Sequence, residues 1–331
     1  MQTIKLGTSG PEISRIGLGC MGMSDFYGPA EENESLATLH AAQEAGVTLY
    51  DSGDFYGMGH NELLLRDALK GQRDRVVLSV KFGALRSPEG AFLGYALRPN
   101  HIQTWIAYSL KRLGTDYIDI YRPARLDPEV PIEEVAGAVK DLIAKGYVRH
   151  LGLSEMSADT VLKAHAVTPV CDLQIEYSLI SRGIEADTLP RPREAGIAIT
   201  AYGVLSRGLI SNTALQGSLN TGHRSAFPRL AGENLAHNLK LVEALAGIAE
   251  QRGATPAQLA IAWVLSRGED IVPLIGARKR SHLVESLGAV NFRLSDSERA
   301  AIEIAIPPDA VQGTRYMAAQ MAHLDSEKTN G

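Results

Sequence analysis

The chain has 331 residues, 45% of them hydrophobic and 21% charged, which is enough apolar material for a sizeable folded core. Its net charge of -5, with both signs interspersed and no long basic run, argues against a nucleic-acid-binding protein. No run of about 18 apolar residues occurs and the first residues lack a secretory pattern, so we expect a cytoplasmic protein that does not enter a membrane.

Short apolar runs alternate with longer segments of helical period along the chain. Eight runs have the length and β-branched content of strands: 15–20, 47–51, 76–81, 117–121, 148–154, 172–178, 197–202 and 271–276. A helical crossover returns the chain to the same edge of a sheet, so this alternation predicts parallel strands. The predicted fold class is α/β, a single (β/α)8 TIM barrel. An open doubly wound sheet is the alternative, but GLGCMGM at 17–23 does not lead directly into a helix, as a dinucleotide-binding turn would.

Several of the predicted helices have recognisable ends. Residues 100–113 carry an apolar stripe at spacings of three and four, and Gly114 follows as a stop. A capping box is predicted at Thr255 with Gln258, and a second at Ser295 with Glu298. Four further glycines close helix-like stretches just before a strand: Gly46, Gly71, Gly146 and Gly196.

The same alternation continues along most of the chain, so we expect one barrel domain over 1–320 and a polar tail over 321–331. Disorder is predicted only for the final DSEKTNG. The irregular connection 203–234 is long enough to suggest a functional loop. The two cysteines, Cys20 and Cys171, are expected to be buried reduced thiols, because they are few and far apart.

Three ionisable residues lie where predicted strands end: Asp51, Tyr56 and Lys81. In a barrel the carboxyl ends of the strands carry the chemistry. A buried Lys81 needs a partner, which Asp51 on the neighbouring strand can supply. A cation beside Tyr56 would lower the pKa of its phenol and make it a proton donor. The alternative is a structural ion pair with an unrelated tyrosine.

The motif DSGDFYGMGHNELLLRDAL, followed by VVLSVKFG, resembles the aldo-keto reductase family. So do LGLSE at 151–155, LQIEYSL at 173–179 and AYGVLSRGL at 201–209. The resemblance implies a (β/α)8 barrel that binds NADPH and transfers hydride to an aldehyde or ketone without metal or flavin. It also implies that Tyr56 is the proton donor, Lys81 its activator and Asp51 the anchor of the lysine.

The resemblance further implies residues that bind the cofactor. Those matching the nicotinamide positions are Ser154, Gln174 and Tyr202, with Gly19, Cys20 and Met21 near the ribose. Those matching the pyrophosphate positions are Leu205, Ser206 and Gly208.

After the last strand, GARKRSHLVES begins a helix where barrels often bind phosphate. Its cations favour a 2′-phosphate, hence NADPH over NADH. The family often has Arg where His282 stands, and Asn where Ser286 stands. If His282 contacts the phosphate, NADPH affinity should increase below about pH 6.5. The site residues predicted in this segment are Gly276, Arg278, Lys279, His282, Glu285 and Ser286, with Arg280 adding charge.

The largest departure from the family is in YIDIYRPARLDP, where Ala124 stands at the position of the usual catalytic histidine. Alanine has no side-chain donor. Either Arg122 or Arg125 could supply one, or an ordered water could fill the space. Alternatively, the larger pocket could accept a bulky substrate, or the reaction could be reduction of a conjugated double bond or of a keto-sugar. Arg122 could instead be a surface or packing residue.

The sequence is therefore compatible with three classes of function. The first is an NADP(H)-dependent carbonyl reductase acting on a small molecule, or an alcohol dehydrogenase in reverse. The second is a regulatory subunit that binds NADPH with little turnover, which a missing histidine would fit. The third is a lyase using Lys81 as a Schiff base, which a charged Lys81 beside Asp51 disfavours. The sequence does not determine the oligomeric state.

Overall fold

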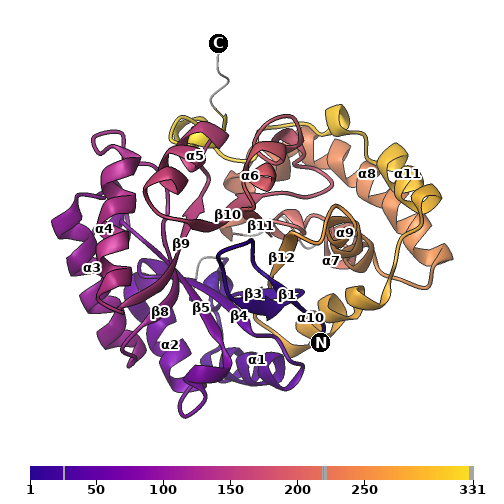
Figure 1. Ribbon diagram of the computed structural model, residues 1–331. Coiled ribbons are helices and arrows are strands. Elements are labelled where there is room, and N and C mark those ends of the chain that lie inside the picture. The colour runs from indigo at the N-terminus through magenta and orange to yellow at the C-terminus, as the bar shows by residue number, and fades with distance from the viewer. Residues whose placement is uncertain (25–26, 218, 220–221, 328–331) are drawn as a thin grey trace.

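The computed structural model describes residues 1–24, 27–217, 219 and 222–327. Eight parallel strands close into a barrel surrounded by helices (Figure 1). In chain order they are β3 (Gly17–Gly19), β4 (Leu49–Gly53), β5 (Val77–Phe82), β8 (Ile118–Pro123), β9 (Val148–Ser154), β10 (Val170–Glu176), β11 (Ala198–Tyr202) and β12 (Ile271–Gly276). Each predicted strand is present, and β12 pairs with β3 to close the ring. The (β/α)8 prediction is confirmed, because an open sheet would leave those two strands unpaired.

The helices lie outside the ring and cover the strands. They are α1 (Glu32–Glu44), α2 (His60–Ala68), α3 (Pro99–Leu113), α4 (Ile132–Ala144), α5 (Ala158–Val167), α6 (Pro190–Glu194), α7 (Asn212–Leu215), α8 (Gly232–Gln251), α9 (Pro256–Leu265), α10 (Arg280–Leu287), α11 (Asp296–Ala305) and α12 (Ala318–Met321). Among the described helices, none has the length and apolar character needed to cross a membrane.

Both predicted capping boxes are formed. Thr255 accepts from the Gln258 N–H at the start of α9, and Ser295 does the same for Glu298 at the start of α11. Gly114 ends α3 with φ of 64°, a left-handed conformation that costs glycine little. Local sequence therefore sets where these helices begin and end.

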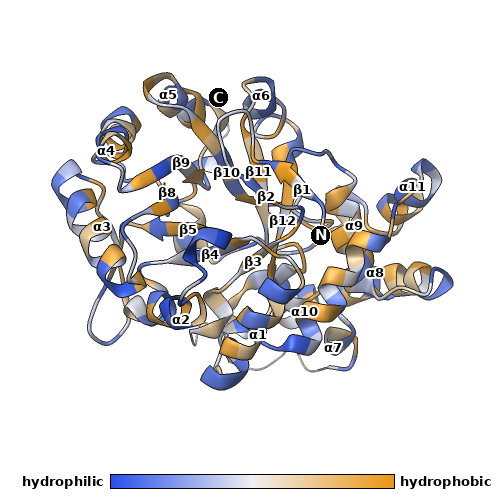
Figure 2. Ribbon diagram, turned by 60° about the horizontal axis from the view of Figure 1, so that its bottom comes forward, coloured by the Kyte–Doolittle hydropathy of each residue, from blue (hydrophilic) through white to orange (hydrophobic). Residues whose placement is uncertain are grey.

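The apolar core has two parts. The larger lies between the strands and the surrounding helices. The smaller fills the barrel interior, where Leu6 and Ile13 of the amino-terminal segment pack on inward side chains such as Leu49 and Val272. The hairpin of β1 (Thr3–Lys5) and β2 (Glu12–Ser14) lies across the ring (Figure 2). It covers the amino ends of the strands and leaves the carboxyl ends for chemistry.

Additional segments lie at the carboxyl ends of the strands. A second hairpin, β6 (Ala84–Arg86) with β7 (Phe92–Tyr95), follows β5 directly. The predicted disorder of 325–331 is wrong for its first three residues, and 328–331 lie outside the described residues. Asp325 accepts hydrogen bonds from the Ser157 N–H and hydroxyl, both at 2.9 Å, at the start of α5. Polar composition alone did not indicate that this carboxylate has a matching helix terminus to bind.

Candidate active site

The site begins with an ion pair on two neighbouring strands. In the register of β4 and β5, Gly53 lies opposite Lys81 and Asp51 opposite Ser79. The Lys81 ammonium is bound to the Asp51 carboxylate, and the two side chains are only 7% and 4% exposed. Asp51 also accepts from the Ser79 hydroxyl at 2.9 Å. The expected pair is therefore present, at the carboxyl ends of the strands.

Tyr56 follows β4 in a tight turn that brings its ring close to this pair. The Lys81 nitrogen lies 5.5 Å from the centre of the Tyr56 ring. The turn continues through Gly57 and Met58, with φ of 55° and 52°. A side chain on Gly57 would come within 2.9 Å of Ser24. A left-handed methionine is a strained conformation of the kind that concentrates at functional sites.

The electrostatics of Tyr56 differ from the prediction. Burial raises the pKa of the Tyr56 phenol well above its ordinary value, and the Asp51 charge raises it further. The largest opposing effect comes from Arg125. The expected acidic phenol is therefore wrong, because burial disfavours the phenolate and the Asp51 carboxylate that pairs with Lys81 disfavours it further. The phenol stays protonated at neutral pH and so remains a proton donor.

The three residues matched to nicotinamide positions lie on adjacent strands. Ser154 on β9 is opposite Gln174 on β10, and both are buried. The Gln174 amide donates to Asp51 at 2.7 Å, so it belongs to the ion-pair network as well. Tyr202 ends β11, and its hydroxyl donates to Glu155 at 2.7 Å.

The residues matched to the ribose positions lie at the end of β3. The Cys20 N–H donates to the Asp51 carbonyl at 2.9 Å, and Gly276 on β12 lies opposite Gly19. Met21 begins the short turn after the strand. Both cysteines are buried free thiols, as expected. Burial raises the pKa of the Cys20 thiol, which makes it a poor nucleophile.

The predicted pyrophosphate residues lie in a strained turn after β11. Ser206 and Arg207 both have positive φ, 45° and 57°. Gly208 follows with φ of 95°. The Arg207 guanidinium stacks 4.3 Å from the Phe227 ring and 4.6 Å from the Tyr316 ring. Contacts with Phe227 of the long connection 203–234 and with Tyr316 of the carboxyl-terminal segment thus stabilise the turn.

In the basic segment after β12, some side chains are exposed and others form hydrogen bonds or ion pairs. Lys279 and His282 are exposed, whereas Ser286 is buried. Arg278 donates to the Gly28 carbonyl at 3.2 Å, and Arg280 pairs with Glu34 at 2.9 Å. The carbonyl of Glu285 accepts from Gln258 at 3.0 Å.

The two arginines around Ala124 have different surroundings. Arg122 is fully buried inside the barrel and donates to both carboxylate oxygens of Asp172, at 3.1 and 3.0 Å. Gly152 makes room for this pair, since a Cβ there would lie 2.7 Å from the Asp172 carboxylate and 3.0 Å from the guanidinium carbon. Arg122 is therefore a core residue, whereas Arg125 donates to the Ser154 hydroxyl at 3.4 Å, and its charge opposes the effect of burial on the pKa of Tyr56.

A further network was not predicted from the sequence. Glu155 is fully buried with φ of 54°, and it accepts from Arg315 at 2.9 and 2.7 Å. The Tyr316 hydroxyl lies 2.8 Å from that of Tyr202. The acid that ends LGLSE was the only signal in the sequence. Its partner lies 160 residues away in the chain, so no local pattern could identify it.

Asp54 lies just before Tyr56, in the turn that follows β4. Its carboxyl group is buried, and one of its oxygens lacks a partner within the described part of the chain. Burial raises the pKa of Asp54 well above its ordinary value, and Glu62 raises it further. A raised folded-state pKa means that stability is lost as pH rises above the unfolded value of about 3.9. We expect Asp54→Asn to stabilise the protein by about 1 kcal/mol at neutral pH and less at low pH. Urea denaturation at both pH values checks this, and equal effects at both would contradict it.

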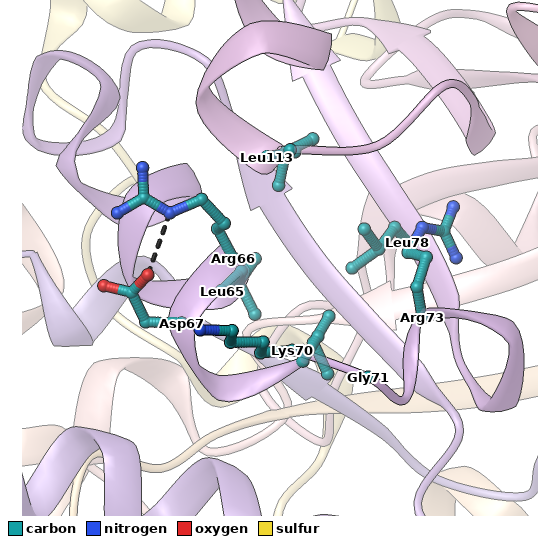
Figure 3. Close-up of a pocket in the computed structure, with 10 residues that line it drawn as sticks. Leu65, Arg66, Asp67, Lys70, Gly71, Arg73, Leu78 and Leu113 are labelled. Atoms are coloured by element: carbon teal, nitrogen blue, oxygen red, sulfur yellow. Dashed lines mark hydrogen bonds and ion pairs between the residues drawn. The ribbon is translucent and has the colours of Figure 1, made fainter.

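Cavities also occur away from this site. One of about 460 Å³ lies where α2 and α3 end, lined by Leu65, Lys70 and Leu113 among others (Figure 3). Those helix ends lie toward the amino ends of the strands, opposite Tyr56. Within 1–24, 27–217, 219 and 222–327, no group of three or more His, Cys, Asp or Glu side chains could hold a metal ion.

Comparison with known proteins identifies the family of the chain and agrees with its fold. The Aldo/keto reductase family matches residues 15–307. A probable aldo-keto reductase 1 of Glycine max is 40% identical over 321 residues, covering 96% of this chain and 92% of its own. The glycerol dehydrogenase AKR11B4 from Gluconobacter oxydans superposes with a TM-score of 0.84 at 27% identity, covering 96% and 99% of the two chains. The thermostable aldo-keto reductase Tm1743, solved with epalrestat, gives 0.74 at 27% identity over 92% and 100%.

Proposed function

Since the chain belongs to the aldo/keto reductase family, we propose that it transfers hydride between NADP(H) and an aldehyde or ketone, or a secondary alcohol in reverse. The observation that carries the proposal is the buried Lys81–Asp51 pair beside the Tyr56 ring. In the reduction, Tyr56 donates its phenolic proton to the substrate oxygen. Lys81 keeps a positive charge beside the phenolate that forms, and Asp51 fixes the position of the lysine.

The residues around the mouth fit a phosphorylated dinucleotide. In the left-handed turn at Ser206 and Arg207, the Ser206 N–H already donates to the Gly203 carbonyl at 2.7 Å, which leaves the Arg207 N–H as the backbone donor that can meet an anion. Exposed Lys279 and His282 can meet a 2′-phosphate, which favours NADPH over NADH. When bound, the cofactor supplies the hydride. Ser154 and Gln174 would hold its nicotinamide amide, and the Tyr202 ring would lie against its face.

The test is stopped-flow oxidation of NADPH by 4-nitrobenzaldehyde, with the alcohol product quantified. We expect one alcohol formed for each NADPH consumed, and weaker activity with NADH. NADPH binding without turnover of aldehydes, enones or keto-sugars would contradict the proposal and favour a regulatory subunit. A borohydride-trapped adduct at Lys81 would instead indicate a lyase.

A further inference from the structure

Ala124 has no side-chain hydrogen-bond donor or acceptor that could meet a substrate in the site. Its own N–H donates to the Phe82 carbonyl at 2.9 Å, and the residue is 2% exposed. No polar side chain therefore comes from this position to meet a substrate. The next residue, Arg125, carries a cationic side chain that can take that role.

Only some of the hydrogen-bond donors of the Arg125 guanidinium have partners among the described residues. One of its nitrogens donates to the Ala124 carbonyl at 2.6 Å and to the Ser154 hydroxyl at 3.4 Å. Within the described ranges, no carboxylate lies within 4.0 Å of Arg125, although the residue is partly buried. A guanidinium carries five donors, so most of them remain available.

Two other arginines at the barrel mouth already have carboxylate partners. Arg315 is bound to Glu155 at 2.7 Å, and Arg207 to Glu176 at 3.4 Å. Glu155 helps to raise the pKa of Arg125 against the effect of burial, but Arg315 already occupies both oxygens of this carboxylate. The charge of Arg125 therefore lacks a dedicated counterion in the described protein. A partly buried cation without one favours binding an anion.

The surroundings of Arg125 are aromatic. Burial lowers the pKa of the Arg125 guanidinium, but the phenols of Tyr202, Tyr316 and Tyr95 are near enough to raise it. Burial raises the pKa of Tyr56, and the Arg125 charge opposes that effect. Tyr95 also contacts the Phe92 ring, with centroids 5.0 Å apart. A ligand that suits this environment combines a flat or apolar body with one negative charge.

We propose that Arg125 binds a carboxylate of the substrate, so that the preferred substrates are oxo acids, aldehydes or ketones that carry a carboxylate. This inference rests on the proposed function and adds the substrate class. A planar guanidinium matches a carboxylate with two parallel hydrogen bonds. One guanidinium also balances one negative charge, whereas a phosphate monoester would bring nearly two.

The experiment compares kcat/KM for the 2-, 3- and 4-formylbenzoates with the corresponding formylbenzamides, which have nearly the same shape and no charge. We expect the best acid to exceed its amide by about 10- to 100-fold, the range for a hydrogen bond to a charged group. In Arg125→Gln the ratio of acid to amide should fall to near one. Arg125→Lys should keep part of it, and a melting curve verifies that each variant is folded.

Arg98→Gln is the matched control. Arg98 precedes α3 and pairs with Glu129 at 3.4 Å, with both side chains more than half exposed. Its loss changes the net charge equally without touching the site, so the ratio should be unchanged. If the natural protein reduces both the formylbenzoate and the formylbenzamide with a kcat/KM ratio near one, the carboxylate-binding role of Arg125 is overturned, but the proposed function is not. Absence of turnover with every aldehyde would overturn the proposed function itself.

Discussion

Tyr56→Phe is expected to lower kcat/KM for carbonyl reduction by about 10²- to 10⁴-fold, the usual contribution of a positioned general acid. The ring would still pack beside Lys81, whose nitrogen lies 5.5 Å from its centre, so the change removes only the proton donor. Steady-state kinetics with an aldehyde, together with a fluorescence titration of NADPH, measure the effect. The titration separates lost chemistry from lost cofactor binding.

Tyr108→Phe is the control for Tyr56→Phe, because Tyr108 is 56% exposed on α3 and lies outside the site. Its activity should match that of the natural protein. Since burial raises the pKa of Tyr56, reduction should not be lost through its ionisation across about pH 6 to 9. Full carbonyl turnover in Tyr56→Phe would remove the phenol from the mechanism.

Arg122→Met is expected to lower the free energy of unfolding by about 3–5 kcal/mol, because it leaves a buried charge uncompensated. Asp172 is fully buried and receives two of its hydrogen bonds from Arg122. Thr200 and Cys171 also donate to it, but neither brings a positive charge. Urea denaturation with the linear extrapolation measures the loss.

The double variant Arg122→Met with Asp172→Leu tests the cause. Replacing a whole buried pair with apolar residues is often neutral or stabilising, so most of the lost stability should return. A double variant as unstable as Arg122→Met would indicate that packing around Gly152, and not charge, dominates. Loss of less than about 1 kcal/mol in the single variant would contradict the prediction.

Much of the fold was predictable because its signals are local. The capping boxes at Thr255 and Ser295 involve residues three apart in the chain, and both are formed. Strand positions follow from runs of apolar residues, and β9 and β12 begin and end where predicted. The ion pair of Asp51 and Lys81 was also predictable, since adjacent parallel strands bring their carboxyl ends together.

The sequence by itself thus determined the barrel, its helix ends and the family motifs. Only the tertiary structure decided the surroundings of the two neighbouring arginines: Asp172 neutralises Arg122 inside the barrel, while Arg125 donates to Ser154 and has no carboxylate within 4.0 Å among the described residues. It also decided that Arg315 is fixed by Glu155 at the mouth. The physical reason is that secondary structure depends on neighbours within a few residues, whereas burial and charge pairing depend on groups brought together from distant parts of the chain.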